Sequence, residues 1–578
     1  MQSEIKNCQN CKKDFIIEPD DFAFYEKIKV PAPTFCPQCR LQRRLAFRNE
    51  RFLYKRKCDF SGKEIFSMRP QEIDIKVYEN SIWFSDKWDA SNYAKDYDFL
   101  KSFFDQLLDL YRKVPTFALS TTMGVDSEYS NNHTGAKNCY LVFHANYPED
   151  CMYGVGINYS KNCIDNTKVD RSENCYGNFF VNSSYDMFFS VQCASSMNLW
   201  FCKDCVGCNY CVGCVGLRNK KYHIFNKSYT KEEYEKEFEK LNFGSYKSVI
   251  DFSKTAYDFW LKFPIKYMQG LKNFDVGGDY INNSKNVHQS YFINGAENIK
   301  YCSNLQIGPV KDCYDYSVWG SGAELVYECM ACGLGVNNSK FCMECWPEVM
   351  NAEYSLFCQS SSNIFGCMGL KNKRYCILNK QYTKEEYFSL REKIIEHMNN
   401  MPYKDSRGLE YRYGEFFPSV FSDVFYNHSS AYEDFSITKE DAIGRGYSWK
   451  ENNKRDYKIT KKSIDLPDSI KDVSDSIVSE VISCGHWSLN PDNAIKNNCT
   501  EAFRILASEL TFYKKFSLPL PRKCPNCRYM ERLKWRNHMK LWHRKCMKPG
   551  CTNEFETSYA PDRPEIVYCE SCYNNEVA

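Results

Sequence analysis

The feature that most constrains the fold is a twelve-residue repeat in the middle of the chain. From Gly135 onward the sequence divides into units such as GAKNCYLVFHAN, YPEDCMYGVGIN and YSKNCIDNTKVD. A fixed short period is typical of architectures in which each repeat stacks on its neighbours. The repeat therefore predicts a β-solenoid over residues 135–228. A cysteine recurs at the fifth position of several units, at Cys139, Cys151, Cys163, Cys175 and Cys211.

The run FCKDCVGCNYCVGC at residues 201–214 has the spacing of a metal motif, but its cysteines belong to successive units of the repeat. Cysteine is small and apolar, so it suits an inward-facing position. We expect these thiols to line the interior rather than to bind metal. The spacing alone leaves metal open at Cys202–Cys214 and at Cys329–Cys345. Disulfides are not expected among the 32 cysteines, because a reducing cytosol keeps thiols free.

A second array follows over residues 271–381, with short insertions. It ends on NKRYCILNKQYTKEEY, much as the first array ends on NKKYHIFNKSYTKEEY. In both, Thr-Lys-Glu-Glu at 230–233 and 383–386 has the pattern of a helix capping box, so a helix is expected to follow each array. We expect two units per turn, because twelve residues enclose little room for the many Tyr, Phe and Trp side chains.

Related cysteine motifs lie at the two ends of the chain. Residues 8–58 and 499–546 align without a gap, and they share a Phe-Tyr pair, an Arg-Asn pair and a final Arg-Lys-Cys. The N-terminal copy has the Cys-x-x-Cys spacing that four-thiolate Zn²⁺ sites use. The C-terminal copy has Lys496 where Cys8 would align, so it reads as degenerate. The predicted ligands are Cys8, Cys11, Cys36 and Cys39 in the first copy, with Cys499, Cys524 and Cys527 left open in the second.

The last residues carry a second complete set of thiols, Cys546, Cys551, Cys569 and Cys572. The intervening EFETSYAPDRPEIVY predicts a β-hairpin, so this set is typical of a short zinc ribbon. The matching N-terminal stretch keeps only Cys58, and we expect it to have lost its ribbon. The sequence thus predicts two Zn²⁺ ions. A third depends on whether Cys484 or His486 completes the C-terminal copy, the alternative being a vacant site.

The Cys-x-x-Cys pair, the Phe-Tyr pair and the Cys-Pro-x-Cys-Arg segment resemble a family of uncharacterised bacterial proteins with zinc-ribbon, or treble-clef, domains. The resemblance covers about 45 residues at each end. It implies a bound metal and a small fold, and it implies no reaction.

Basic residues concentrate in the two cysteine modules. Residues 36–63 carry nine Lys and Arg against two acidic residues, and residues 522–548 carry ten against one, whereas the whole chain has a net charge of +3. Clustered cations interleaved with Trp535 and Trp542 are typical of nucleic-acid contact. Pairing with the acidic remainder of the chain is the alternative. The candidate nucleic-acid residues are Arg40, Arg43, Arg44, Arg48, Arg528, Arg532, Arg536 and Lys540.

Catalytic signatures are missing from the sequence. It has nine histidines but no His-Glu-x-x-His, phosphate loop or nucleophile elbow. We therefore expect a non-catalytic zinc protein with no small-molecule substrate. Its zinc modules are expected to contact RNA or a ribonucleoprotein, with a protein–protein scaffold as the alternative. The first residues lack a secretory signal and no apolar run could span a membrane, so a cytoplasmic location is expected.

The predicted fold is mixed and mainly β: tandem β-solenoid arrays with helical inserts, flanked by treble-clef and zinc-ribbon modules. Residues 97–113 and the segment DLPDSIKDVSDSIVSEVI (465–482) are expected to form helices. The predicted domains are 1–60 (zinc module), 61–134 (strand and helix connector), 135–228 (first array), 229–270 (helical insert), 271–381 (second array), 382–483 (helical or irregular connector), 484–545 (degenerate zinc module) and 546–578 (zinc ribbon).

Overall fold

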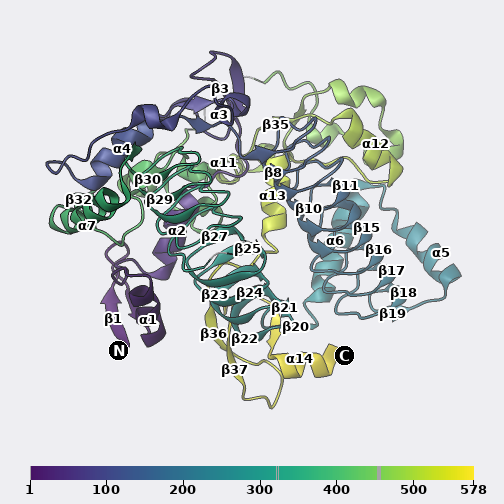
Figure 1. Cartoon of the computed structure of the whole chain (residues 1–578). Helices are drawn as coiled ribbons and strands as arrows, with labels where there is room; N and C mark the ends of the chain where they lie inside the picture. Colours follow the sequence, from purple (N-terminus) through teal and green to yellow (C-terminus); the bar gives the residue numbers. More distant parts are fainter. Residues whose placement is uncertain (1, 321, 323, 452–456, 578) are drawn as a thin grey trace.

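The computed structural model describes residues 2–320, 322, 324–451 and 457–577. The chain is a mixed α/β protein in which parallel sheets predominate. Two arrays of short strands form its centre, and helices and small antiparallel hairpins surround them (Figure 1).

The first array consists of two sheets, ordered β14-β12-β10-β9-β8-β7 and β11-β13-β15-β16-β17-β18-β19. All neighbours are parallel except β18 and β19. Each strand pairs with the residues twelve positions later, as Val155 does with Thr167 and Cys163 with Cys175. The strands are β7 (Thr121–Thr122), β8 (Asn131–Thr134), β9 (Phe143–Asn146), β10 (Val155–Asn158), β11 (Lys161–Ile164), β12 (Thr167–Asp170), β13 (Glu173–Tyr176), β14 (Phe179–Asn182), β15 (Tyr185–Phe188), β16 (Met197–Trp200), β17 (Asn209–Val212), β18 (Lys221–Ile224) and β19 (Lys227–Ser228).

Neighbouring strands of a sheet are therefore one repeat unit apart, and the expectation of two units per turn is wrong. The reason is where the large side chains lie. Cys163, Val169 and Cys175 are at most 1% exposed and belong to an interior cluster of aliphatic and cysteine side chains that contains no aromatic residue. The aromatic rings instead face away from it. Trp200, for example, stacks on Phe243, which follows the array, at 4.9 Å between ring centroids.

Within each unit the backbone adopts a positive φ at every third residue. The values are +54° at Asn162, +57° at Asp165, +59° at Lys168 and +45° at Arg171. Only Gly, Asn and Asp adopt this left-handed conformation readily, which accounts for the abundance of Asn and Asp in the repeats. The interior positions also recur every third residue.

This three-residue period explains the run of cysteines at 202–214. Cys202, Cys205, Cys208, Cys211 and Cys214 are all 0% exposed and lie in the interior cluster. They occupy successive inward positions, and their Sγ–H groups donate to nearby backbone carbonyls. Among the described residues, no array cysteine belongs to a group that could hold a metal ion, and all the cysteines are free thiols.

The second array has longer strands and a less regular register. Its main sheet runs β21-β22-β23-β24-β26, with β25 pairing β23 and β27, and a further sheet runs β28-β29-β30-β31. The offset is twelve residues between Val287 and Ile299 and fourteen between Ile299 and Cys313, as the insertions require. The strands are β21 (Gly270–Leu271), β22 (Phe274–Asn282), β23 (Lys285–Asn294), β24 (Ala296–Lys300), β25 (Ser303–Ile307), β26 (Val310–Tyr314), β27 (Ser317–Gly320), β28 (Met350–Glu353), β29 (Ser362–Phe365), β30 (Arg374–Ile377) and β31 (Lys380–Gln381).

A helix follows each array, as the capping boxes predict. The Thr230 hydroxyl accepts from the Glu233 N–H and the Thr383 hydroxyl accepts from the Glu386 N–H, each at the first turn of its helix. The helices are α5 (Lys231–Leu241) and α6 (Tyr246–Trp260) after the first array, and α7 (Lys384–Asn400) after the second.

The connectors agree with the sequence in one case and differ in another. The helix expected near 97–113 is α4 (Phe103–Lys113). The α-helix expected in 465–482 is absent from these described residues, which form 3₁₀ turns η5 (Ile470–Asp472) and η6 (Asp475–Ser479), preceded by η4 (Ser463–Asp465). Ser469 and Ser474 each accept a hydrogen bond from a backbone N–H two residues later, and such local bonds compete with helix formation.

Other short elements complete the connectors. They are η1 (Ala90–Tyr93), β6 (Thr116–Phe117), β32 (Tyr403–Lys404), β33 (Glu410–Tyr411), η2 (Ser419–Phe421), η3 (Tyr426–His428), α8 (Ala431–Asp434) and α9 (Lys439–Gly444).

The two cysteine modules have matching elements. The N-terminal module has β1 (Glu4–Asn7), β2 (Asp14–Ile17), α1 (Pro19–Lys27) and α2 (Pro37–Ala46). The C-terminal module has β34 (Ile482–Ser483), β35 (Ala502–Phe503), α12 (Ala507–Lys515) and α13 (Pro525–Leu533), with α10 (Gly485–Leu489) and α11 (Pro491–Lys496) inserted after β34.

The modules pack against the arrays in a crossed arrangement. Helix α2 of the N-terminal module contacts β27 of the second array, and α13 of the C-terminal module contacts β12 of the first. Figure 1 shows purple α2 beside the green strands of the second array and yellow α13 beside the blue strands of the first. Each array is therefore packed against the zinc module that is farther from it along the chain.

Candidate metal centres

The N-terminal centre forms where the loop after β1 meets the start of α2. Cys8, Cys11, Cys36 and Cys39 bring their sulfur atoms within 4.8 Å of one another. The Sγ atoms of Cys11 and Cys36 are 3.8 Å apart, which is about the separation expected for four sulfurs at ~2.3 Å around a tetrahedral Zn²⁺.

Neighbouring groups orient these thiols. The Cys36 N–H donates to Cys8 Sγ at 3.3 Å, and Asn10 Nδ2 donates to Cys39 Sγ at 3.2 Å. Hydrogen bonds from Cys36 and Cys39 hold the pKa of Cys8 well below its usual range. Such contacts favour the thiolate, which is the form that binds metal.

The C-terminal module contains a complete second centre, so the prediction that this copy is degenerate is wrong. Cys484 joins Cys499, Cys524 and Cys527 in a group with the same 4.8 Å spread. Its contacts repeat those of the first centre: the Cys524 N–H donates to Cys484 Sγ at 3.3 Å, and Cys499 and Cys524 are 3.7 Å apart at sulfur. Hydrogen bonds from Cys484 and Cys499 hold the pKa of Cys524 well below its usual range.

Gapless alignment misses Cys484 because a segment is inserted into the loop. Cys8 and Cys11 are three residues apart, whereas α10 and α11 separate Cys484 from Cys499. The backbone restores the match: the Cys8 N–H donates to Lys13 O, and the Cys484 N–H donates to Glu501 O. His486, the other candidate for the fourth ligand, instead lies with Nδ1 3.2 Å from Cys527 Sγ, the position that Asn10 has beside Cys39.

The third centre lies between the β36–β37 hairpin (Trp542–Lys545 and Glu554–Thr557), β38 (Ile566–Tyr568) and the start of α14 (Glu570–Val577). Cys546, Cys551, Cys569 and Cys572 form the predicted group. The Cys569 N–H donates to Cys546 Sγ at 3.3 Å. Although burial raises the pKa of Cys569, hydrogen bonds from Ser571 and Asn553 lower it to about 6.

The N-terminal ribbon has lost ligands but not its backbone. Strands β3 (Tyr54–Lys57) and β4 (Glu64–Ser67) form the hairpin, followed by β5 (Val77–Tyr78) and α3 (Asn80–Trp83). The Glu79 N–H donates to Cys58 Sγ at 3.3 Å, as the Cys569 N–H does to Cys546. Among the described residues Cys58 belongs to no four-ligand group. The expectation that the whole ribbon is lost is therefore wrong, and what is lost is its thiols.

The arginines predicted to contact nucleic acid lie inside the protein. In the N-terminal module Arg40 pairs with Asp315 at 2.5 Å and Arg44 donates to the Ser317 hydroxyl at 3.0 Å. The side chains of Arg40, Arg43, Arg44 and Arg48 are at most 6% exposed. Arg43 pairs with Glu328 at 2.7 Å and Arg48 with Glu50 at 2.6 Å.

The C-terminal module repeats this arrangement on the other array. Arg528 and Arg532 pair with Asp165 at 3.2 and 3.1 Å, and Arg532 also donates to the Thr167 hydroxyl at 3.2 Å. Arg536 pairs with Asp434 at 2.9 Å. Of the eight residues only Lys540 is exposed.

Asp165 and Asp315 have equivalent places in the two arrays. Asp165 lies between β11 and β12, Asp315 between β26 and β27, and each forms ion pairs with two arginines of one cysteine module. Tyrosines extend the match: Tyr301 donates to Asp21 of the N-terminal module at 3.1 Å, and Tyr153 donates to Glu509 of the C-terminal module at 3.0 Å. Both interfaces join buried charges that the sequence places far apart.

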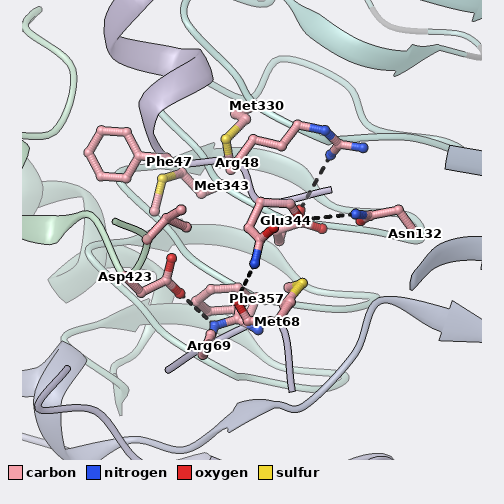
Figure 2. A pocket seen from close by; sticks show the side chains of 12 residues that line it. Phe47, Arg48, Met68, Arg69, Asn132, Met330, Met343, Glu344, Phe357 and Asp423 are labelled. Atoms are coloured by element: carbon pink, nitrogen blue, oxygen red, sulfur yellow. Dashed lines mark hydrogen bonds and ion pairs between the residues drawn. The ribbon is translucent and has the colours of Figure 1, made fainter. Parts of the chain in front are cut away.

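Figure 2 shows the polar contacts at the edge of the N-terminal interface, around a cavity of about 10 Å³. Arg69 of the connector pairs with Asp423 at 2.5 Å, and Arg48 approaches Glu344 of the second array at 3.9 Å. Burial raises the pKa of Glu344. A space of this size holds about one water molecule, so it has no room for a substrate.

Comparison of the chain with protein-family models, curated proteins and solved structures finds no significant match. These comparisons identify no family. Of the resemblance inferred from sequence, the structure supports the metal sites: it contains three four-cysteine groups that could each hold an ion such as Zn²⁺. In the described part of the chain, no helix is both long and apolar enough to cross a bilayer.

Proposed function

We propose that this chain is a non-catalytic protein–protein interaction scaffold in which three Zn²⁺ ions are purely structural. One observation supports this most directly: the seven arginines among the predicted nucleic-acid-binding residues pair with carboxylates of the same chain, in the arrays, in the connector or in their own module. Their charge serves the internal assembly of the chain and is not free for an external polyanion.

The chemistry of the donor sets supports a structural role for zinc. Each group supplies four thiol ligands, which fill the tetrahedral coordination of Zn²⁺ and leave no position for a water or substrate. We propose that the metals of the first two centres each fix the start of a helix. Cys36 is the N-cap residue of α2, and Cys524 is the N-cap residue of α13. The helices then direct their arginines at Asp315 and Asp165.

We further propose that each array is a β-solenoid with one twelve-residue unit per turn. The twelve-residue register and the three-residue alternation of inward side chains support this reading. Stacked turns give a stiff, extended surface, which solenoid proteins commonly use to bind partners.

Metal content and salt dependence test the proposal together. Native mass spectrometry is expected to find three Zn²⁺ per chain, and removing them with a chelator should release α2 and α13 from the arrays. Partners recovered from native lysate should persist after nuclease treatment. Partners lost completely with nuclease would contradict the scaffold.

Nucleic-acid contact is the second candidate, supported by cations that remain exposed. Lys534 and Lys540 are exposed on the C-terminal module, and Lys540 Nζ lies 5.1 Å from the centre of the Trp542 ring. A cation beside an indole suits stacking on single strands. If this candidate holds, affinity for an RNA pool should fall steeply with salt, and Lys534→Glu with Lys540→Glu should abolish it. The matched control is Lys514→Glu, on the exposed side of α12.

A further inference from the structure

A cavity of about 360 Å³ lies between the two arrays and is separate from all three metal centres. Strands β10, β12 and β14 of the first array form one wall, and β22, β23 and the end of β25 form the other. Its volume is within the range of small-ligand sites in proteins, ~300–1,000 Å³. Neither the zinc modules nor the scaffold proposal uses it.

Lys168 lies between this cavity and a neighbouring space that Glu50, Glu433 and Asp434 line, and Glu50 and Glu433 raise its pKa from a distance. Its Nζ donates to Asn304 Oδ1 at 3.1 Å and lies 4.8 Å from the centre of the Phe292 ring. Among the described residues no carboxylate approaches it within ion-pair distance. Burial lowers the pKa of Lys168 to about 8, so an anion bound beside it would restore the full charge.

Arg171 lies on the same wall, three residues after Lys168, at the next position with a positive φ. Its guanidinium pairs with Asp170 at 2.6 Å and covers the Tyr159 ring at 5.3 Å. The side chain is 63% exposed, so its remaining N–H donors are accessible to a ligand. With Lys168, Arg171 and Asp170 all ionised, the lining has a net positive charge.

Amides supply the rest of the polar lining. An asparagine side chain carries two N–H donors and an acceptor oxygen, a combination that matches sugar hydroxyls. Asn158 Oδ1 already accepts from Asn146 Nδ2, and Asn282 Oδ1 accepts from the Leu271 N–H, so these two residues present their Nδ2 donors to a ligand. The rings of Phe180, Tyr280 and Phe292 pack on one another, with Phe180 and Tyr280 4.5 Å apart and Tyr280 and Phe292 4.8 Å apart. Their faces are therefore occupied, which disfavours a stacked nucleobase. The asparagines are Asn146, Asn158, Asn182, Asn282 and Asn294.

We infer that this cavity binds a small anionic, polyhydroxylated ligand, either a sugar acid or a sugar phosphate. Lys168 and Arg171 recognise its charged group and the asparagines recognise its hydroxyls. No bond is made or broken in the site. The inference does not depend on the scaffold proposal, so either one can fail alone.

Isothermal titration of the full zinc-loaded chain tests the inference with four probes: glucuronate, glucose 6-phosphate, glucose and inorganic phosphate. We expect glucuronate or glucose 6-phosphate to bind at least tenfold more tightly than glucose and than phosphate. Whichever of these two probes binds more tightly shows whether the site prefers a carboxylate or a phosphate group. Equal binding of phosphate and glucose 6-phosphate would overturn the recognition of hydroxyls, and no preference over glucose would overturn the inference entirely.

Variants assign the binding to these residues. Lys168→Met removes the charge but keeps an unbranched apolar side chain. It should lower the affinity for the preferred probe at least tenfold. Arg171→Ala, at an exposed side chain, provides a second test should Lys168→Met prove unstable. Lys161→Met, on the other sheet of the same array, is the matched control and should bind like the unaltered chain. Wild-type affinity in both cavity variants would refute the site.

Discussion

Asp165 offers the sharpest test of the crossed interfaces. Its side chain is 2% exposed and forms ion pairs with Arg528 and Arg532, which are 9% and 7% exposed. Removing one partner of a buried ion pair costs about 3–5 kcal/mol, because the other charge stays buried without compensation. In Asp165→Asn, Arg528 keeps Glu509 at 3.5 Å, whereas Arg532 has no other carboxylate within ion-pair distance among the described residues. The amide still offers one acceptor oxygen, so we expect the lower end, about 3 kcal/mol.

Native-state hydrogen exchange measures this cost locally, which matters because a chain with several packed units need not unfold in one step. Amides of α13 should exchange roughly 150-fold faster in Asp165→Asn, since each factor of ten is about 1.36 kcal/mol. Amides of α2, which packs on the other array, should not change. The equivalent Asp315→Asn should reverse this pattern.

A surface pair provides the control. Glu531 of α13 pairs with Lys523, and their side chains are 43% and 32% exposed. Glu531→Gln should cost less than about 1 kcal/mol because water and salt screen such pairs. If Asp165→Asn accelerates α13 exchange no more than Glu531→Gln does, the buried charges do not hold the module and the reasoning fails.

Three further predictions concern the metals, the interior and pH. Cys484→Ser should reduce bound zinc from three to two equivalents by native mass spectrometry, whereas Cys58→Ser should leave three; three equivalents in Cys484→Ser would show that Cys484 is not a required ligand. Cys163→Leu should destabilise the first array by about 1–3 kcal/mol in denaturant titration because the added volume must displace the fully buried neighbours Cys151 and Cys175, and Cys163→Ala should cost less. Burial raises the pKa of Asp279 to about 6, above its unfolded value near 3.9, so the folded state holds this proton more tightly. The stability from Asp279 is therefore full well below its unfolded pKa, and about 3 kcal/mol is lost in all as pH rises through the folded pKa of about 6. Asp279→Asn should remove that component of the unfolding free energy measured against pH, and an identical profile in the variant would contradict it.

Much of the framework could be predicted from sequence because it rests on local patterns. The twelve-residue period of Cys139, Cys151, Cys163 and Cys175 predicts the stacked strands, and Thr230 and Thr383 predict where helices follow. That neighbouring strands lie one unit apart, and not two, could not be predicted from the aromatic content. The ring of Trp200 lies away from the interior cluster and is covered by Phe243, beyond the end of the array.

In the candidate metal sites, too, the local part could be predicted and the long-range part could not. Adjacent Cys-x-x-Cys pairs are visible in the sequence, whereas Cys484 reaches its centre only because β34 pairs with β35 across an insertion. The basic helices were visible as charge, but the choice between an external polyanion and internal carboxylates depended on Asp165 and Asp315. No local pattern marks either residue as the partner of an arginine several hundred positions away.

Because of the crossed packing, helix α2 is synthesised long before the array that it packs against. Arg40 meets a carboxylate 275 positions downstream, so at ~5–20 residues per second the N-terminal helix waits roughly 15–55 seconds before its partner emerges. During that interval the three arginines of α2, Arg40, Arg43 and Arg44, lack the carboxylates that pair with them in the folded chain. Binding of zinc early in synthesis would keep this segment folded until the array emerges. The metal would then support folding during synthesis as well as the stability of the final structure.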